Sequence, residues 1–192
     1  MVLFTPRFDK SAREKAVVDA ALRLIAQDGD AGMTVRRLAA EASVPVSSIY
    51  ELAPSQDGVR GVRVAVMREV ADRIGQRIEA LPADLIGPQW GKAALRALLP
   101  LNPQRRQEVT ATLYIAASAL HDPVLHAAWK LVDDAVLETC VRALHAMGLE
   151  GGQAQQDQLH AVIDGLARLM VLQADERSPE WGVTILDRML PT

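Results

Sequence analysis

The stretch "RRLAAEASVPVSSIYELAPSQDG", residues 36–58, decides the fold of the N-terminal part of this chain. It predicts a short helix, a tight turn and a second short helix. Leu38 and Ala42 repeat at helical spacing in the first helix, and Ile49 is the apolar residue that the second helix would bury. The turn "ASVP", residues 42–45, has small side chains that let the two helices cross closely.

These two helices are expected to pack on a helix that precedes them. Residues 9–27 repeat apolar side chains at helical spacing, and the glycines of "DGDAG" end the pattern. Thr34 can cap a second helix over residues 34–43. A third helix is expected over residues 45–52, because a proline at the first helical position loses no hydrogen bond. The buried face of the first helix is expected to consist of Val17, Ala21, Leu24 and Ile25.

A long fourth helix is expected over residues 55–80, with Ser55 as its cap. Its apolar stripe is long enough to pack against two bodies, so we expect it to connect an N-terminal domain, residues 1–54, with a C-terminal domain, residues 81–192. Turn signals such as "LPLNP", "HDP" and "MGLEGG" separate five further helices. These helices are expected over residues 89–99, 104–120, 123–147, 153–174 and 179–190. The sequence therefore predicts an all-α fold of about nine helices.

Composition restricts the class of protein. With 192 residues, of which 49% are hydrophobic, the chain suits a globular protein and not a disordered or fibrous one. A net charge of −3 argues against non-specific coating of nucleic acid, which rests on many Lys and Arg contacts to phosphate. No apolar run reaches the roughly 18 residues of a membrane helix, so we expect a cytoplasmic protein without a membrane partner. Cys140 is the single cysteine and is interpreted as a small buried hydrophobe.

The second helix of a helix-turn-helix can lie in the major groove of DNA. If Val44 and Ile49 face the core, the helix between them turns a set of short side chains outward. Short polar and apolar side chains suit base edges and thymine methyl groups, and hydroxyl groups can donate to phosphates. Between Ala42 and Val59, however, there is no Lys or Arg. The outward side chains are expected to be those of Val46, Ser47, Ser48 and Tyr50.

The run "VVDAALRLIAQDGDAGMTVRRLAAEASVPVSSIYELAPSQDGV", residues 17–59, resembles the N-terminal DNA-binding domain of the TetR family of transcriptional regulators. The matching features are "AALRLIAQDG", "TVRRLAAEA", the turn with Val44, and "SSIY" before the fourth helix. The tail "HAVIDGLARLMVLQADERSPEWGVTILDRML", residues 160–190, is similar to the last two helices of choline-sensor-like members. The resemblance implies a regulator, most often a repressor, that binds a palindromic double-stranded DNA operator as a homodimer. It also implies release by a small-molecule effector, with no further cofactor.

The resemblance implies roles for individual residues as well. Thr34 would cap a helix or contact phosphate, and Arg36 would contact a base or the DNA backbone. The family usually has glycine at Ser43, histidine or tyrosine at Leu52 and lysine at Gln56. Because the last two differences remove contacts with the DNA backbone, we expect a shallower salt dependence than in other members. The positions carried over as DNA contacts are Thr34, Arg36, Arg37, Pro45, Val46, Ser47, Ser48, Tyr50 and Gln56.

The alternative is a helix pair that keeps this shape without binding DNA. Across residues 1–60, eight basic and eight acidic side chains cancel, so bulk charge gives DNA binding no support. The protein would then be a helical dimeric ligand-binding or interaction protein.

The C-terminal half is expected to bind the effector and to form the dimer. Trp90, Tyr114 and Trp129 fall on the fifth, sixth and seventh expected helices, where the family has its effector pocket. Aromatic side chains with a polar tip suit such a pocket, and they also suit a core. The last two helices carry the expected dimer interface, for which the alternative is closure of the subunit's own core. The interface residues are Val162, Leu166, Leu169, Trp181, Ile185 and Met189.

An enzyme is not expected. His121 and His126 are five residues apart, which is not the i, i+4 spacing of a helical zinc pair. The run "SALHD" brings Ser118, His121 and Asp122 together at a helix end, but adjacency in sequence is not the geometry of a catalytic triad. The sequence also has no glycine-rich phosphate loop, so we expect neither catalytic residues nor a metal site.

Overall fold

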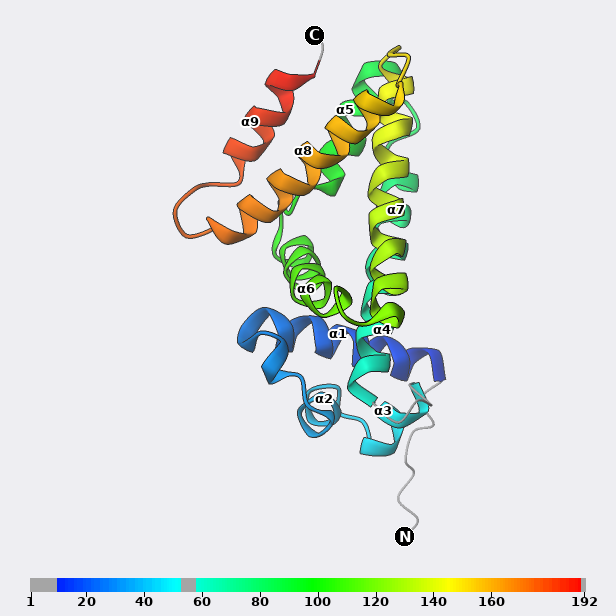
Figure 1. Cartoon of the computed structure of the whole chain (residues 1–192), viewed down its shortest axis with the longest axis vertical. Coiled ribbons are helices and arrows are strands. Elements are labelled where there is room, and N and C mark those ends of the chain that lie inside the picture. The colour runs from blue at the N-terminus through cyan, green and yellow to red at the C-terminus, as the bar shows by residue number, and fades with distance from the viewer. Residues whose placement is uncertain (1–9, 53–57, 191–192) are drawn as a thin grey trace. The chain divides into compact units, whose positions relative to one another are not determined.

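The computed structural model describes residues 10–52 and 58–190. Within these ranges the chain forms helices joined by turns and no strands, which confirms the predicted all-α fold (Figure 1). No helix in these ranges combines the length and apolarity needed to cross a membrane. The α-helices are α1 (Lys10–Asp28), α2 (Val35–Glu41), α3 (Val46–Leu52), α4 (Gly58–Glu79), α5 (Gly87–Leu98), α6 (Pro103–Ala119), α7 (Pro123–Ala146), α8 (Gln153–Leu172) and α9 (Glu180–Met189), with a 3₁₀ turn, η1 (Asp30–Gly32), after α1.

The chain divides into two compact units, Met1–Val66 and Met67–Thr192, and the division falls inside α4. α4 therefore contributes its first residues to one unit and its later residues to the other. It is the helix that the sequence predicts as the connector. The expected cap of this helix, Ser55, lies outside the described residues.

The first unit is built around the apolar face of α1. All four predicted residues of that face are buried, with no side chain more than 3% exposed. α2 and α3 both pack on α1, where they bury Leu38 and Ile49 completely. Full burial of an aliphatic side chain of this size stabilises a fold by roughly 1.5–3 kcal/mol. This packing determines which face of α3 is left to solvent.

The turn between α2 and α3 contains a left-handed residue. Before it, Thr34 caps α2 as predicted, and its Oγ1 accepts a hydrogen bond from the N–H of Arg37 at 3.3 Å. After α2, Ser43 has a φ of +54°, a conformation that strains most side chains and suits glycine. The N–H of Val44 then donates to the carbonyl of Ala39 at 3.0 Å. The turn therefore needs a left-handed residue at position 43, where glycine would fit best.

α3 begins at Val46, one residue later than predicted. Pro45 precedes the helix, and its carbonyl accepts a hydrogen bond from the N–H of Ser48 at 3.0 Å. A cap residue behaves in this way, because it lies outside the helix while its carbonyl accepts one of the first hydrogen bonds.

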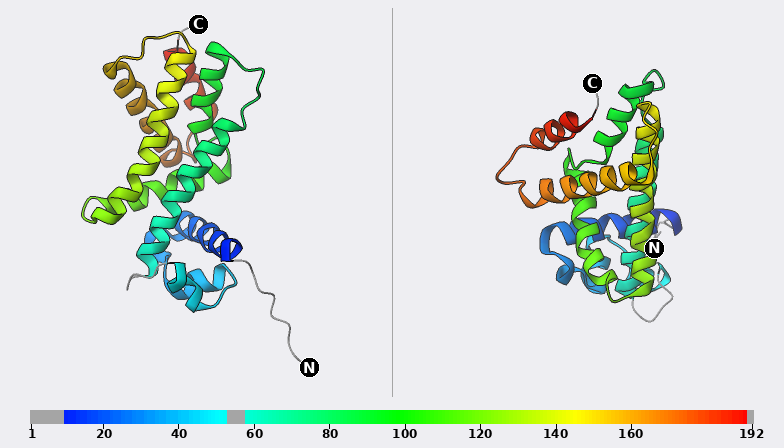
Figure 2. Two further views of the ribbon diagram at one scale, coloured as in Figure 1. Left: turned by 90° about the vertical axis from the view of Figure 1, so that its right-hand side faces the viewer. Right: turned by 45° about the horizontal axis from the view of Figure 1, so that its top comes forward.

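In the second unit, α7 contacts both α5 and α6, and α8 packs on α6 and α7 (Figure 2). α9 lies on α8. An ion pair joins α9 to α5, with Nε of Arg96 3.2 Å from Oδ1 of Asp187. The helices of this unit therefore form a layered bundle.

Local signals set the starts of α6 and α7. The side chain of Asn102 accepts a hydrogen bond from the N–H of Arg105 at 2.9 Å. Oδ1 of Asp122 accepts from the N–H groups of Val124 and Leu125 at 2.9 and 3.2 Å. A proline follows each cap, at a position where its missing N–H is not needed. The boundary signals "LPLNP" and "HDP" are therefore confirmed as helix starts.

α5 and α7 approach each other closely at Gly91. A Cβ atom at this position would lie 2.9 Å from the carbonyl oxygen of Ala143 and 2.9 Å from Cγ of Met147. Because a backbone oxygen cannot move aside as a flexible side chain can, only glycine fits this helix crossing without a shift.

Candidate DNA-binding helix and effector cavity

α3 presents a polar and apolar face to solvent. Val46 and Tyr50 are 44% and 49% exposed, and Ser47 is also exposed, as predicted. Ile49 is completely buried on the opposite side. The methyl groups of Val46 can approach base edges, and the hydroxyl groups of Ser47 and Tyr50 can donate to phosphates.

Ser48 does not belong to this face, and the prediction that it points outward is wrong. It is 4% exposed and lies with Leu52 beside Arg13 and Glu14 of α1. Positions 48 and 52 are four residues apart, so they share one side of the helix, and that side packs on α1. Glu51 adds an ion pair from α3 to Arg13 at 4.0 Å.

The two arginines at the start of α2 have different surroundings. Arg36 is exposed and forms no hydrogen bond or ion pair with any residue of the described ranges. Arg37 instead pairs with Asp28 of α1. Of the two, Arg36 therefore has its guanidinium available for a phosphate group.

Two other positions were predicted as DNA contacts. Pro45 is exposed and directly precedes α3, and Gln56 lies outside the described residues.

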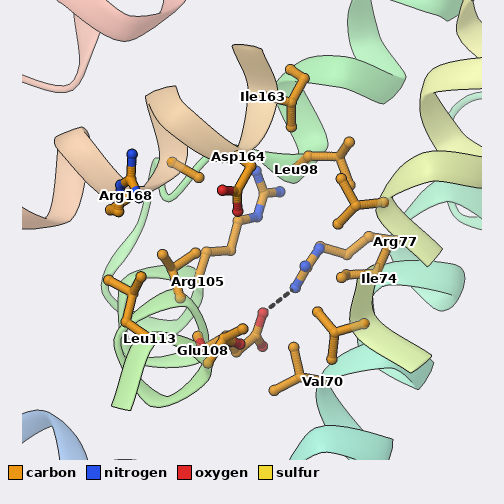
Figure 3. Close-up of a pocket in the computed structure, with 15 residues that line it drawn as sticks. Val70, Ile74, Arg77, Leu98, Arg105, Glu108, Leu113, Ile163, Asp164 and Arg168 are labelled. Atoms are coloured by element: carbon orange, nitrogen blue, oxygen red, sulfur yellow. Dashed lines mark hydrogen bonds and ion pairs between the residues drawn. The ribbon is translucent and has the colours of Figure 1, made fainter. Parts of the chain in front are cut away.

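The second unit contains a cavity of about 70 Å³ lined by α4, α5, α6, α7 and α8 (Figure 3). One ordered water needs only about 10–15 Å³, so the cavity is larger than a single water site. Most of its lining is aliphatic, including Val70 and Ile74 of α4, Val132 of α7 and Ile163 of α8. Val136 of α7 is half-buried because it also lines this cavity.

A buried carboxylate lies at the edge of the cavity. Glu108 of α6 is 2% exposed. Its Oε2 accepts a hydrogen bond from Nη1 of Arg77 at 2.6 Å, and its Oε1 lies 3.4 Å from Nη1 of Arg73. Arg73 also donates from Nε to Glu69 at 2.8 Å. Since both arginines come from α4, the carboxylate joins α6 to α4 and its charge is compensated.

Arg105 is a third guanidinium in this region, three residues before Glu108 on α6. Its Nη1 donates to the carbonyl of Arg96 at 3.5 Å, a long hydrogen bond, and its Nε is shielded from solvent without an acceptor in the described ranges. Burial and the neighbouring Arg77 guanidinium lower the pKa of Arg105, and Glu108 partly offsets their effect. Arg105 thus brings a positive charge with no ion-pair partner among the residues that the structure describes.

These charged residues were not predicted as part of a site. Glu108 lies on the inward face of α6 with Ala111 and Ile115, both completely buried. An acidic residue within an apolar stripe is the signal that points to it, because a buried carboxylate needs partners.

The three aromatic residues predicted for the effector pocket are not in the lining of this cavity. Trp90 packs on buried residues of α4 and α5, with the guanidinium of Arg142 5.1 Å from its ring centroid. Tyr114 is 45% exposed. Trp129 lies near His126, with 5.7 Å between the ring centroids. A contact between any of the three and an effector stays a prediction.

α8 and α9 present apolar side chains to solvent. Leu169, Ile185 and Met189, all predicted for a dimer interface, are 40%, 39% and 47% exposed. Leu172 is 69% exposed and was not predicted. Apolar side chains of this size on two adjacent helices are suited to burial in an interface.

The other predicted interface residues are less accessible. Leu166 is 6% exposed, so it helps to close the core of its own unit, which is the alternative that the sequence left open. Val162 and Trp181 are half-buried, and the guanidinium of Arg177 lies 5.1 Å from the ring centroid of Trp181.

Cys140 is completely buried on α7, which confirms its interpretation as a core residue. Burial raises the pKa of its thiol to about 12. A thiol with such a pKa is protonated and unreactive at neutral pH. In residues 10–52 and 58–190, no three His, Cys, Asp or Glu side chains are grouped so that they could hold a metal ion.

Two family models match the chain. A model of bacterial regulatory proteins of the tetR family matches residues 17–60, which include the helix-turn-helix. A model of the C-terminal region of BetI-type transcriptional repressors matches residues 88–192, more than half of the chain. A search of curated proteins found no significant match.

Several solved structures share the fold. A transcriptional regulator from Rhodococcus sp. Rha1 is 21% identical and has a TM-score of 0.78, with 91% of each chain covered. A protein from Saccharomonospora viridis in complex with choline is 19% identical and has a TM-score of 0.76, with 93% of this chain and 95% of that chain covered. A TetR-family member from Streptomyces coelicolor A3 is 26% identical and has a TM-score of 0.67, with 94% and 99% covered. The chain therefore belongs to the TetR family of bacterial transcriptional regulators.

Proposed function

We propose that this protein is an effector-responsive repressor that binds a palindromic operator as a dimer and is released by a small molecule. The observation that carries the proposal is the exposed face of α3, with Val46, Ser47 and Tyr50, on a helix whose other side is buried against α1. A second helix presented in this way can enter the major groove.

The DNA contacts would be divided between α3 and α2. α3 has no Lys or Arg, so its short side chains would contact base edges, with Tyr50 donating to a phosphate. The exposed guanidinium of Arg36 would supply a charged contact with the DNA backbone. Each phosphate contact adds about 0.9 to the slope of log K against log salt, so a protein with few such contacts should bind with a shallow salt dependence.

Two subunits would associate through the exposed apolar side chains of α8 and α9. A two-fold dimer presents the same helix to both half-sites of a palindrome, which is the reason for expecting a symmetric operator.

The effector would act through α4. Val70, Ile74 and Arg77 of this helix line the cavity, and the first residues of the same helix belong to the helix-turn-helix unit. A ligand that binds one position of α4 more tightly than another shifts the protein toward that position. In a dimer, this shift would change the separation of the two α3 helices.

The test is a gel shift and footprint on DNA upstream of the gene itself and of its neighbours, repeated over a salt series. We expect protection of a palindrome. Arg36→Ala should weaken binding to all sequences alike and lower the salt slope by about one unit for each phosphate that Arg36 binds. Arg23→Ala is the matched control, because Arg23 is engaged by Glu41 at 2.7 Å, and it should change the slope little.

Failure to bind any palindromic site at low salt would contradict the proposal. It would favour the second candidate, a dimeric ligand-binding or interaction protein. The lack of basic residues on α3 is the observation that supports this candidate.

A further inference from the structure

The charged groups around the cavity have an excess of positive charge. Arg77, Arg105 and Arg168 line it, against the carboxylates of Glu108 and Asp164. Glu108 is already compensated by guanidinium groups of α4. Asp164 and Arg168 lie one turn apart on α8, and both are exposed to solvent, which screens their charges. The guanidinium of Arg105 is partly desolvated and forms no ion pair with any residue of the described ranges, although the carboxylate of Asp164 lies toward it (Figure 3).

The bonding of Arg105 is also incomplete. A guanidinium has five N–H donors in a planar fork that matches the two oxygens of a carboxylate. In Arg105, Nη1 donates a long hydrogen bond to the carbonyl oxygen of Arg96 at 3.5 Å. The buried Nε has no acceptor in the described ranges. Because Nε has almost no accessible surface, a ligand carboxylate would bind the other N–H groups of the guanidinium.

Arg77 and Arg105 lie where the apolar cavity meets a polar groove. Both residues also line a second, more open depression, together with Gln76, Asn102 and Gln104. A ligand with its charged group at the two guanidinium groups would therefore have its remaining part among the aliphatic side chains, such as Ile163 (Figure 3). This arrangement suits an amphipathic molecule.

We infer that the effector is a small organic carboxylate whose apolar body fills the cavity and whose carboxylate binds the guanidinium of Arg105. The inference rests on the proposed function of the cavity as the effector site. The apolar body must be compact, because the cavity is about 70 Å³. A cavity that binds benzene has about 150 Å³, so an aromatic acid would require some expansion and a short aliphatic acid would not.

A quaternary ammonium ligand such as choline does not suit this cavity. Cations of this kind are held by the faces of aromatic rings. None of the 15 residues that line the cavity is aromatic, and the charge at its edge would repel a cation. The chain thus differs in ligand class from the Saccharomonospora viridis protein, which was solved with choline.

The same geometry provides a route from ligand to α4. A carboxylate at Arg105 would share the cavity with Arg77 and Glu108, so it could compete with Glu108 for Arg77. Competition would weaken the link between α6 and α4.

The test is isothermal titration calorimetry of the full-length protein with a matched series of ligands. The carboxylates are benzoate and the straight-chain acids from butanoate to octanoate. The neutral matches are benzyl alcohol and the alcohols of the same chain lengths, and choline is the cationic probe. We expect the best carboxylate to bind at least about tenfold more tightly than its alcohol, because only the carboxylate forms charge-assisted hydrogen bonds with Arg105.

Arg105→Gln should abolish the preference for the carboxylate, and its effect on the affinity for the alcohol should be the smaller of the two effects. Arg142→Gln removes the same charge from α7, outside the cavity lining, and should leave the preference intact. Circular dichroism checks that each variant is folded. The comparison of acid with alcohol on the unaltered protein tests the ligand class even if Arg105→Gln does not fold.

Equal affinity for acids and alcohols, binding of choline in place of the acids, or no binding of any acid would each overturn the inference. Release of the operator is measured separately. A carboxylate that binds through Arg105 but leaves the operator complex intact would support the ligand class and contradict the effector response. Failure of DNA binding would contradict the proposed function, while calorimetry would still decide the ligand class.

Discussion

Arg77 of α4 donates a hydrogen bond from Nη1 to Oε2 of the buried Glu108 of α6 at 2.6 Å. This ion pair joins α4 to α6 within the second unit, at the edge of the cavity. Glu108→Gln should lower the free energy of unfolding by about 3 kcal/mol, because it removes the carboxylate that two largely buried guanidinium groups share. Urea unfolding followed by circular dichroism measures the change. Glu138→Gln, at an exposed position of α7, is the control and should have little effect.

Ser43→Gly should stabilise the protein by about 0.5–1 kcal/mol, because it relieves a left-handed conformation that a Cβ atom disfavours. The φ of +54° is the structural basis. Ser43→Ala keeps the Cβ atom and should not stabilise. Thermal unfolding of both variants separates the backbone effect from the loss of the hydroxyl group, and equal melting temperatures would contradict the explanation.

Gly91→Ala and Gly75→Ala should have opposite effects. At Gly91 the new methyl group would meet the carbonyl oxygen of Ala143 at 2.9 Å, so we expect a loss of about 1–3 kcal/mol from overpacking. At Gly75, in the exposed interior of α4, a Cβ atom meets nothing within 4 Å. Alanine there should add up to about 1 kcal/mol through helix propensity. Chemical denaturation of both variants measures the difference, and a stabilised Gly91→Ala protein would show that α5 and α7 do not pack as described.

Ile185→Glu should disrupt the dimer, because it places a charge among the exposed apolar residues of α8 and α9. Leu120→Glu is the matched control, since Leu120 is 77% exposed at the end of α6 and lies outside the predicted interface. Sedimentation velocity over a range of concentrations should give a monomer for the first variant and a dimer for the second. A dimer in both cases would exclude this interface.

The thiol of Cys140 should be unreactive in the folded protein. Burial raises its pKa from the usual 9.0 to about 12, so the folded state holds the proton more tightly than the unfolded state. The free energy of unfolding should therefore fall as the pH rises above 9.0 toward about 12. Cys140→Ala should remove this pH dependence. Labelling with a thiol reagent at about pH 8 should occur only after denaturation, and rapid labelling of the folded protein would contradict the prediction.

Most of the secondary structure could be predicted because its signals are local. Asn102 and Asp122 cap helices with their own side chains, and the prolines after them are placed where a missing N–H is harmless. The stripes of α1 and α7 follow the helical period and need no knowledge of their partners. For the same reason, the predicted position of α3 was wrong by only one residue.

The direction of single side chains was less predictable. Ser48 and Ser47 are neighbours of the same type, yet Ser48 packs on α1 and Ser47 faces solvent. The rotation of a short helix about its axis depends on how it packs, and a seven-residue helix with few apolar residues leaves that rotation open. Leu166 and Leu169 differ in the same way on α8.

The sequence by itself determined the all-α fold, the helix ends and the helix-turn-helix, because caps, prolines and apolar periodicity act within a few residues of one another. Only the tertiary structure decided which charged groups meet at the cavity. Arg77 and Glu108 are 31 residues apart and lie on different helices. Their contact depends on how α4 packs against α6, and no local pattern in either helix specifies that packing.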